Sequence, residues 1–496
     1  MKCAVMELGI IGGSESAMYR SFKGFARSMI GLYCLDKGEE TYPSSYSMKW
    51  KLLAFCVLLV MITALMLSSG YLRLPGFINQ TTFETGIGQT FDSDKRIENI
   101  APLDVSADKT PKSSDTGLGK GKSDTAEIQA MINSLPDSGG EVVIPSGTYL
   151  IDAVKSIWLK SNMTLTMAPD AILKAIPNNA ATYAVLQIAD VENVRISGGT
   201  ILGERKEHLG TSGEWGMGVR ITGSKDISIQ NTVVNDCWGD GFYIGTGTAG
   251  RHSERISLID VQADNNRRQG ISLISGKDIK IVRPRLTNTY GTPPAAGLDI
   301  EPNRVTETLE NIEVLDAYTA GNAEGILIVL NKLNGVGTPI SIHIRNHQDD
   351  GSGRGLLVSS GDAIVPGLLT IEDSVWSNAK KNGLSIQNHD HRSFAIEVIR
   401  PRIINANQSG ALSAVTGSAI AIYHFNGRNG IIGNVSIFNP LITDTGDGPK
   451  AVTAFYISNS QGQEIANLSI IDPVLGGNMA NHPIPEKLRQ YIKYTR

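Results

Sequence analysis

Two acidic residues, Asp299 and Glu301, lie two positions apart in the stretch GLDIEPN at residues 297–303. The alternation predicts a short strand with Leu298 and Ile300 on its inner face and both carboxylates on the outer surface, roughly 6.6 Å apart along the backbone. Strand interiors disfavour Asp and Glu, whereas paired carboxylates suit general acid–base catalysis. We therefore expect Asp299 and Glu301 to be catalytic.

Further polar residues stand in or just before similar strand-like stretches. Asp240, in CWGDG, is a third candidate acid, although Asp-Gly is also a common turn. An insertion at residues 203–217 would overhang the same surface, where Trp215 could stack on a sugar ring and His208 could titrate. Four consecutive strands span only about 15 Å. We therefore expect the polar residues of these strands to line one groove. Its expected substrate-binding residues are Arg267, Arg268, Arg220, Tyr243, Trp215 and Glu324.

Each of these residues also has a structural interpretation. Arg267 and Arg268 can be solvated charges, although two bases flanked by acids suit a polymer carboxylate, and the insertion can be an ordinary surface loop. A second cluster, NHDH at residues 388–391 with His424, has a spacing that could hold a metal. Nothing in that cluster specifies a ligand geometry, so no metal site is predicted.

The elements that would position these groups recur along the chain. Apolar residues at i and i+2 repeat at intervals of about 30 residues, a period typical of solenoids. Because each unit is rich in strands and ends in Gly or Asn turns, the pattern predicts a single-stranded, right-handed parallel β-helix of about 10–12 coils over residues 123–480. The pairs begin at Val194, Ile227, Ile256, Ile279, Ile312, Ile340, Leu369, Ile396, Val435 and Leu468. A second strand of the pattern Gly-apolar-x-apolar follows in most coils, and GLDIE at 297 is one of these.

A third set of positions, equivalent from coil to coil, supports this alignment. Nine residues after the first apolar residue of a pair, Asn or Asp occupies seven of eight positions: Asp236, Asn265, Asn288, Gly321, Asp349, Asn378, Asn405 and Asp444. Stacked Asn and Asp side chains satisfy each other and the turn backbone in a β-helix. The repeat is therefore structural, and Asp236 and Asn265 are assigned to it.

The repeat begins with a predicted helix, Asp124–Leu135, in which Asp124 and Glu127 form a capping box. Together with IPSGTYLI it resembles the first segment of the pectin-lyase-like superfamily, in the group of rhamnogalacturonase- and epimerase-like proteins and phage tailspikes. The matching positions are Gly121, Ser123, Asp124, Thr125, Ile128, Gln129, Pro145, Gly147 and Tyr149. The resemblance implies the parallel β-helix fold with a capping helix, over about residues 115–478. The motifs of polygalacturonases and of mannuronan epimerases are absent from the sequence, so it does not imply those particular activities.

The N-terminal quarter of the chain differs in composition. Residues 52–72 are apolar and uncharged, and Lys49 and Lys51 precede them. This predicts a membrane-spanning anchor, with a cytoplasmic extension at 1–51 and the rest outside; the alternative is a signal peptide that is cleaved to give a secreted protein. Residues 73–122 read as a linker, and 481–496 as a C-terminal tail. The formal net charge of −4 argues against nucleic acid as a partner.

The leading hypothesis is an exported, membrane-anchored protein that acts on an acidic or complex polysaccharide, in the periplasm or outside the cell. In a hydrolase, one of Asp240, Asp299 and Glu301 would protonate the leaving oxygen and another would activate water. In a lyase or epimerase, Arg267 or Arg268 would take a proton, and the acids would be the ligands of Ca²⁺, the one cofactor considered. The alternative is a glycan-binding or structural solenoid without catalysis, which the aliphatic middle coils favour.

Overall fold

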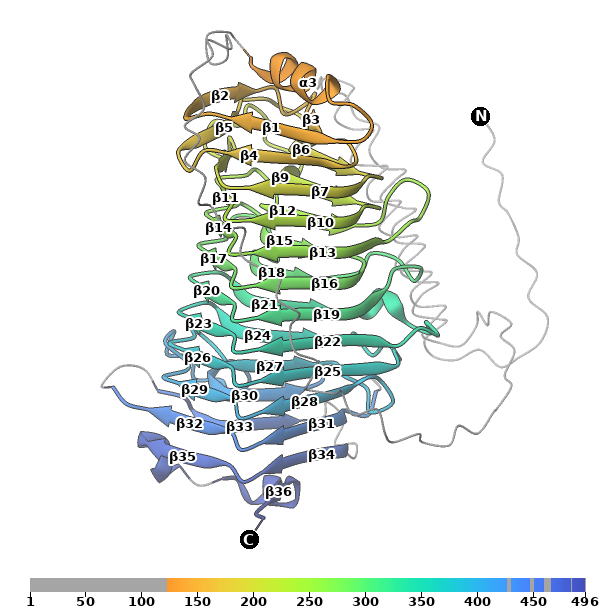
Figure 1. Cartoon of the computed structure of the whole chain (residues 1–496). Helices are drawn as coiled ribbons and strands as arrows, with labels where there is room; N and C mark the ends of the chain where they lie inside the picture. Colours follow the sequence, from red (N-terminus) through yellow and green to blue (C-terminus); the bar gives the residue numbers. More distant parts are fainter. Residues whose placement is uncertain (1–122, 426–429, 447–449, 459–464, 483, 496) are drawn as a thin grey trace, which may run out of the picture. The chain divides into compact units, whose positions relative to one another are not determined.

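The structure is a computed structural model, which describes residues 123–495 apart from 426–429, 447–449, 459–464 and 483. Its strands form three parallel sheets, and successive turns of the chain add one strand to each (Figure 1). The predicted parallel β-helix is therefore confirmed. Sheets of 13, 12 and 11 strands agree with the expected number of coils.

The three sheets, called A, B and C, follow one another within each coil. Sheet A consists of β1 (Gly140–Ile144), β4 (Met163–Met167), β7 (Glu192–Ser197), β10 (Lys225–Gln230), β13 (Ser253–Ile259), β16 (Gly276–Val282), β19 (Leu309–Leu315), β22 (Ile340–Arg345), β25 (Gly367–Glu372), β28 (Ala395–Ile399), β31 (Gly433–Phe438), β34 (Ala466–Ile471) and β36 (Ile492–Lys493). Sheet B consists of β2 (Gly147–Ile151), β5 (Ala171–Ala175), β8 (Thr200–Leu202), β11 (Val233–Asn235), β14 (Gln262–Asp264), β17 (Arg285–Thr287), β20 (Tyr318–Ala320), β23 (Gln348–Asp350), β26 (Val375–Ser377), β29 (Arg402–Ile404), β32 (Leu441–Asp444) and β35 (Val474–Gly477). Sheet C consists of β3 (Ile157–Trp158), β6 (Thr182–Ala189), β9 (Trp215–Thr222), β12 (Phe242–Gly245), β15 (Gln269–Leu273), β18 (Ala296–Ile300), β21 (Glu324–Val329), β24 (Arg354–Ser359), β27 (Leu384–Gln387), β30 (Ser418–Tyr423) and β33 (Thr453–Ser458).

The inward side chains of the three sheets stack into one apolar core, as the repeat predicts. Ile227, Ile256 and Ile279 pair in consecutive strands of sheet A. One predicted pair is displaced, because Ile312 pairs with Ile342 and not with Ile340. Ile340 is also buried, so the sequence there offered two apolar registers, and the neighbouring coils select the second one.

The predicted turn column adopts the left-handed backbone conformation. Its members Asp236, Asn265, Asn288, Gly321, Asn378 and Asn405 have φ between 53° and 65°, a region that only Gly, Asn and Asp visit routinely. Asp349 does not belong to the column, because in the displaced register the ninth residue is Gly351, with φ of 71°. Asp444 lies in β32, and its carboxylate accepts a hydrogen bond from the Ala451 N–H at 3.0 Å.

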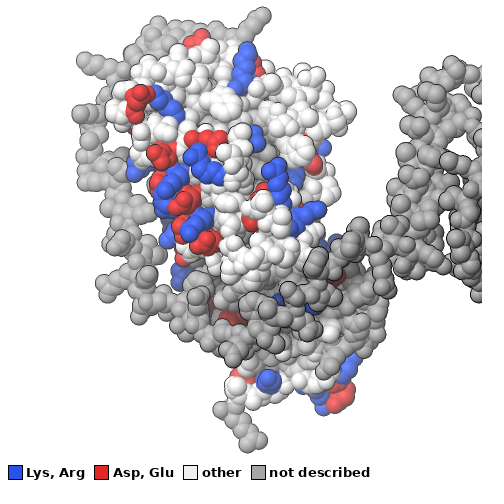
Figure 2. Space-filling model, turned by 90° about the vertical axis from the view of Figure 1, so that its right-hand side faces the viewer, with Lys and Arg blue, Asp and Glu red and all other residues white. Residues whose placement is uncertain are grey.

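Two further left-handed columns flank the apolar pairs of sheet A and were not predicted. One contains Asp226, Arg255, Asp278 and Asn311, and the other contains Asp260, Arg283, Asp316 and Asn346. Ion pairs connect the coils at these columns, with Arg255 Nε 2.6 Å from Asp226 Oδ1 and Arg283 Nε 2.7 Å from Asp260 Oδ1. Charges of both signs alternate along one stripe of the face drawn in Figure 2.

Helix α3 (Thr125–Asn133) covers the first coil, with Ile128 and Ile132 buried against the core. Asp124 is the residue before the helix, as expected, but the predicted capping box is wrong. The Asp124 carboxylate accepts from the Leu150 N–H at 2.7 Å, on β2, and makes no side-chain hydrogen bond to the helix. A contact to the first coil therefore replaces the local cap.

At the other end, sheet A continues beyond residue 480. The 3₁₀ helices at Asn478–Asn481 and Glu486–Tyr491 precede β36, which pairs with β34. Two other short helices, Asn331–Leu333 and α4 (Ala414–Gly417), lie in loops. None of the helices in the described part of the chain is long and apolar enough to cross a membrane. The predicted anchor at 52–72 lies outside the described residues.

Candidate functional site on the outer face of sheet C

Glycines set the geometry of sheet C at the point where each strand begins. A Cβ atom on Gly270, Gly297 or Gly325 would lie 2.4–2.7 Å from the carbonyl oxygen of the corresponding glycine in the next coil. Such an approach is too close for any side chain, so only glycine permits this stacking. The residue before each glycine is thereby held in its own column, which contains Asp240, Gln269, Ala296, Glu324 and Arg354.

The register places the middle residues of these strands in one outward column. Tyr243 pairs with Arg220 on one side and with Ser272 on the other. Ser272 pairs with Asp299, and Asp299 pairs with Leu327. Polar groups therefore occupy consecutive coils from β9 to β18 on one face.

Asp299 lies in this column but does not face solvent, which corrects the expectation of a surface carboxylate. Its exposed fraction is 0%, whereas Glu301 is half-buried. Gln269 Nε2 donates to Asp299 Oδ2 at 2.8 Å, and Oδ1 has no hydrogen-bond partner among the described residues. Burial raises the pKa of Asp299 well above its usual range, and the neighbouring Glu301 raises it further. Asp299 can therefore hold a proton at a pH where an exposed aspartate cannot.

Asp240 is also fully buried, two strands away from Asp299, or about 10 Å along the axis. Both of its oxygens accept from Arg268 Nη1, at 3.2 and 3.1 Å, and Ser272 Oγ donates to Oδ2 at 2.9 Å. Burial raises the pKa of Asp240, against the opposing effect of Arg268. Both oxygens of Asp240 therefore bind Arg268, and Asp240 orients that guanidinium.

Arg268 is therefore not a candidate base. Burial lowers its pKa, but Asp240 and Asp299 outweigh burial, so that the net pKa is raised. Arg268 Nε lies 3.8 Å from Glu214, in the loop before β9, and has no hydrogen-bond partner among the described residues. A permanently charged guanidinium next to two acids can bind an oxygen of a ligand, but it cannot accept a proton.

Arg267 points to the loop at 203–214 and not to the carboxylates. Its guanidinium lies 3.8 Å from the centre of the Trp238 ring, and Nη1 donates to the Gly213 carbonyl at 3.0 Å. The His208 ring also stacks on Trp238, and the centres of the two rings are 3.9 Å apart. Arg267 therefore holds the loop in place, and its predicted contact with substrate stays a prediction.

The same loop buries the His208 side chain. Its side chain is 1% exposed, and Nδ1 lies 3.0 Å from the buried carboxylate of Glu204. Glu204 also accepts hydrogen bonds from Tyr183 and Asn178. Trp215, in contrast, is 45% exposed at the start of β9 and stays available for stacking on a ligand. The loop is thus an ordered wall beside the face.

Arg220 and Tyr243 lie on the same side of the carboxylates as this wall. The Arg220 guanidinium carbon is 5.9 Å from the Tyr243 ring centre, within the range of a cation–π contact. Arg220 Nε is buried and has no hydrogen-bond partner among the described residues. Both side chains are half-buried, so they can contact a ligand above Asp299 as predicted.

Glu324 and Arg354 form a second charged pair, one and two coils beyond Asp299. They are paired in register, and Arg354 Nη1 donates to Glu324 Oε1 at 2.5 Å. Burial raises the pKa of Glu324 to about 7, against the opposing effects of Arg354 and Lys381. Glu324 Oε2 has no hydrogen-bond partner among the described residues.

Replacing Glu324 by glutamine should change how stability depends on pH. Because the folded-state pKa is raised, the stability that Glu324 contributes is complete below about pH 4.5 and is lost as the pH rises to about 7. The unfolding free energy of the wild type should fall across this window by up to roughly 3 kcal/mol more than that of the variant, since each pKa unit corresponds to about 1.36 kcal/mol. Urea unfolding of both proteins at pH 4.5 and 7.5 measures the difference. An equal change in unfolding free energy for both proteins between these two pH values would mean that the pKa of Glu324 is not raised in the folded state.

An aliphatic patch separates the acidic coils from a polar region further along sheet C. Ala296, Leu327 and Leu357 form a cluster with Val329 on the outer face. Beyond it, the outward columns continue with Ser385, Gln387, Tyr423 and Tyr456. The face thus combines acids, a permanent cation and aromatic rings, whereas Leu327 and Leu357 are themselves buried.

The histidine cluster is not assembled into a metal site. His389 is buried, its Nε2 lies 3.0 Å from the Phe394 carbonyl, and burial lowers its pKa to about 4. Asp390 is paired with Arg392, and His424 Nε2 lies 3.3 Å from Asp362. Across the described residues, no group of three or more His, Cys, Asp and Glu side chains could hold a metal ion. Ca²⁺ binding stays a prediction.

Gln269, Ser272 and Arg354 were not among the predicted site residues. Gln269 positions Asp299, Ser272 positions Asp240, and Arg354 positions Glu324. A signal for them was present, since all three occupy the two columns that contain the acids.

Comparison with known proteins supports the fold. Among solved structures, the chain is similar to an exopolygalacturonase from Thermotoga maritima, with a TM-score of 0.50 and 14% identity over 71% of this chain and 88% of that one. It is also similar to the tailspike of Escherichia coli bacteriophage HK620 in complex with a pentasaccharide, with a TM-score of 0.53 and 13% identity over 73% of this chain and 65% of that one. The chain has the pectin-lyase-like parallel β-helix fold.

At the sequence level, no protein-family model matches. The uncharacterized protein YclG of Bacillus subtilis is 31% identical over 262 residues, covering 46% of this chain. The match spans less than half of the relative, 44% of its length. Pectin-lyase-like β-helices are therefore the group with which this chain shares its fold, and the fold alone does not determine an activity.

Proposed function

We propose that this protein cleaves an acidic or complex polysaccharide by hydrolysis on the outer face of sheet C. The observation that carries the proposal is the buried Asp299, whose pKa is raised by burial, next to the half-exposed Glu301. Two neighbouring carboxyl groups with different environments can serve as acid and base. Two proteins of the same fold are an exopolygalacturonase and a tailspike with a bound pentasaccharide, which makes a carbohydrate partner consistent with the site.

In this mechanism Asp299 donates its proton to the glycosidic oxygen as the bond to the anomeric carbon breaks. Glu301, which reaches solvent, accepts a proton from the water that attacks that carbon, and the pair then exchanges a proton with solvent. Arg268 stays charged and binds a hydroxyl or carboxylate oxygen of the sugar. Elimination is less well supported, because neither Arg268 nor Arg267 is placed to act as a base.

A panel of polysaccharides, assayed for new reducing ends and for the absorbance of unsaturated uronates, tests the proposal. Hydrolysis predicts reducing ends without a rise in absorbance, and activity that falls at a pH above the usual carboxyl range, where Asp299 loses its proton. A rise in absorbance would instead indicate a lyase. Reducing ends that persist in a variant with Asp299→Asn and Glu301→Gln would place the chemistry elsewhere.

A glycan-binding solenoid without catalysis is the second candidate, favoured by the exposed Trp215 and the half-buried Arg220 and Tyr243, which can contact a sugar without any chemistry. The same panel separates the two functions. A polysaccharide that binds to the wild-type protein and is recovered intact after prolonged incubation would support the binder. In that case Asp299→Asn should change the affinity for the polysaccharide, and neither the variant nor the wild type should cleave it.

We further propose that residues 52–72 anchor the protein in a membrane and that the β-helix lies outside the cytoplasm. The apolar run preceded by Lys49 and Lys51 supports this orientation. Protease added to intact cells or spheroplasts should release a fragment that contains the β-helix. Protection of that fragment from the protease would contradict the orientation.

A further inference from the structure

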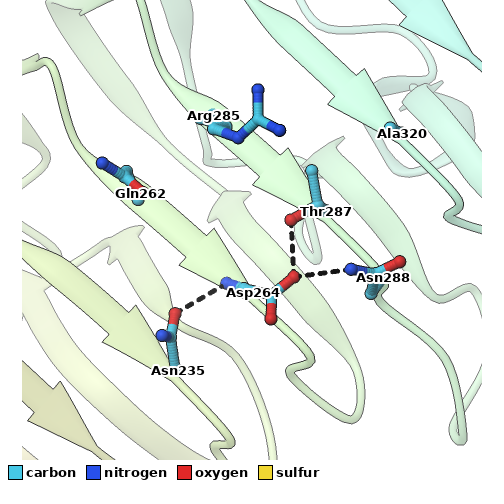
Figure 3. A pocket seen from close by; sticks show the side chains of 7 residues that line it. All are labelled: Asn235, Gln262, Asp264, Arg285, Thr287, Asn288 and Ala320. Carbon is cyan, nitrogen blue, oxygen red and sulfur yellow. Dashed lines mark hydrogen bonds between the residues drawn. The ribbon is translucent and has the colours of Figure 1, made fainter.

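The outer face of sheet B carries a hollow of about 400 Å³ that is separate from the carboxylates of sheet C (Figure 3). It spans four consecutive strands, β11, β14, β17 and β20. Figure 3 shows the side chains of neighbouring strands projecting to this one face. The lining consists of Asn235, Gln262, Asp264, Arg285, Thr287, Asn288 and Ala320.

Asp264 occupies the centre of the hollow in a fixed orientation. Its Oδ1 accepts from Thr287 Oγ1 at 2.5 Å and from Asn288 Nδ2 at 2.7 Å. Its backbone N–H donates to Asn235 Oδ1 at 3.0 Å. The other carboxylate oxygen, Oδ2, receives no hydrogen bond from the residues that the structure describes. One acceptor is thus held in place and left for a ligand.

Arg285 supplies the complementary donors on the next strand. Its guanidinium carbon lies 4.4 Å from the centre of the Tyr318 ring, which keeps the planar group flat against an aromatic face. Within the described part of the chain, neither Arg285 nor Gln262 makes a side-chain hydrogen bond, and both are exposed. At Ala320 the column loses the bulk that Thr287 and Asp350 provide in the adjacent coils, which leaves space beside Asn288.

We infer that this hollow is a second binding site, for a neutral saccharide unit. One acceptor on Asp264 and several donors on Arg285 and Gln262 suit the adjacent hydroxyls of a sugar, each of which both donates and accepts. Asp264 and Arg285 carry opposite charges, so that an anionic or cationic ligand would meet one repulsive partner. The volume lies within the range of small-molecule sites. Such a site would hold a polysaccharide or a surface glycan independently of its cleavage on sheet C.

Saturation-transfer NMR with a set of methyl glycosides of glucose, galactose, mannose and rhamnose tests this inference on the full chain. At least one glycoside should bind, and Arg285→Ala and Asp264→Asn should each weaken it by at least roughly tenfold, because each removes a hydrogen bond to a charged group. Arg195→Ala, an exposed arginine on β7 in sheet A, should leave binding unchanged and serves as the matched control.

The doubly substituted sheet C protein, Asp299→Asn with Glu301→Gln, distinguishes this site from the proposed catalytic one. Binding of the glycoside should persist in it, and Arg285→Ala should not change the release of reducing ends from a short soluble substrate. Loss of glycoside binding in the sheet C variant would place the sugar on sheet C and overturn the inference. So would binding that survives both sheet B substitutions, or the failure of all four glycosides to bind.

Discussion

Replacing Asp299 by asparagine should lower polysaccharide cleavage by a factor of at least roughly one hundred, the contribution typical of a general acid. The shape of the side chain and its contact with Gln269 are nearly preserved, so the loss would come from the missing proton. Initial rates of reducing-end formation, measured at the optimum pH on the substrate found in the panel, give the factor. Asp137→Asn, at a fully exposed aspartate, is the matched control and should retain full activity.

The same substitution should not destabilise the protein near neutral pH. The pKa of Asp299 is raised in the folded state, so its stabilising contribution is complete below its ordinary pKa and is lost as the pH rises. Asparagine cannot ionise, and the variant should therefore be as stable as the wild type at pH 7 or more stable. An Asn variant that unfolds more readily at neutral pH would show that the ionised carboxylate is structural and that the chemistry lies elsewhere.

Replacing Leu298 by alanine should have the opposite result, a loss of about 2–5 kcal/mol of unfolding free energy with the site chemistry retained in the folded fraction. Leu298 is 0% exposed and belongs to the continuous core, where neighbouring coils prevent collapse around a cavity. Urea or thermal unfolding followed by circular dichroism measures the change.

Leu412→Ala is the matched control, because Leu412 is 92% exposed and should change stability by no more than about half a kcal/mol. Leu298 and Asp299 are consecutive residues that face opposite sides of one strand. A stability loss restricted to Leu298 and an activity loss restricted to Asp299 would separate the scaffold from the site. An equal, small effect of both leucine substitutions would contradict the assignment of Leu298 to the core.

The repeat was predictable because it follows from local alternation. Inward positions such as Ile256 and Ile279 must be apolar in every coil, and turns with positive φ favour Asn, Asp or Gly, as at Asn265 and Asn288. These requirements are imposed residue by residue, so a single sequence contains them. The displaced pair at Ile340 shows the limit, because two apolar registers satisfied the local rule and only pairing with Ile312 selected Ile342.

The sequence alone therefore determined the solenoid, the register of its outward columns and the gathering of acids near β18. The tertiary structure decided what those acids do, because the burial and the hydrogen-bond partners of the site residues depend on residues 28 to 54 positions away in the sequence. Asp299 is buried and accepts a hydrogen bond from Gln269. Asp240 accepts hydrogen bonds from Arg268, and the Arg267 guanidinium lies against the Trp238 ring. A pKa depends on desolvation and on charges in neighbouring coils, and neither quantity is encoded in the spacing of a motif.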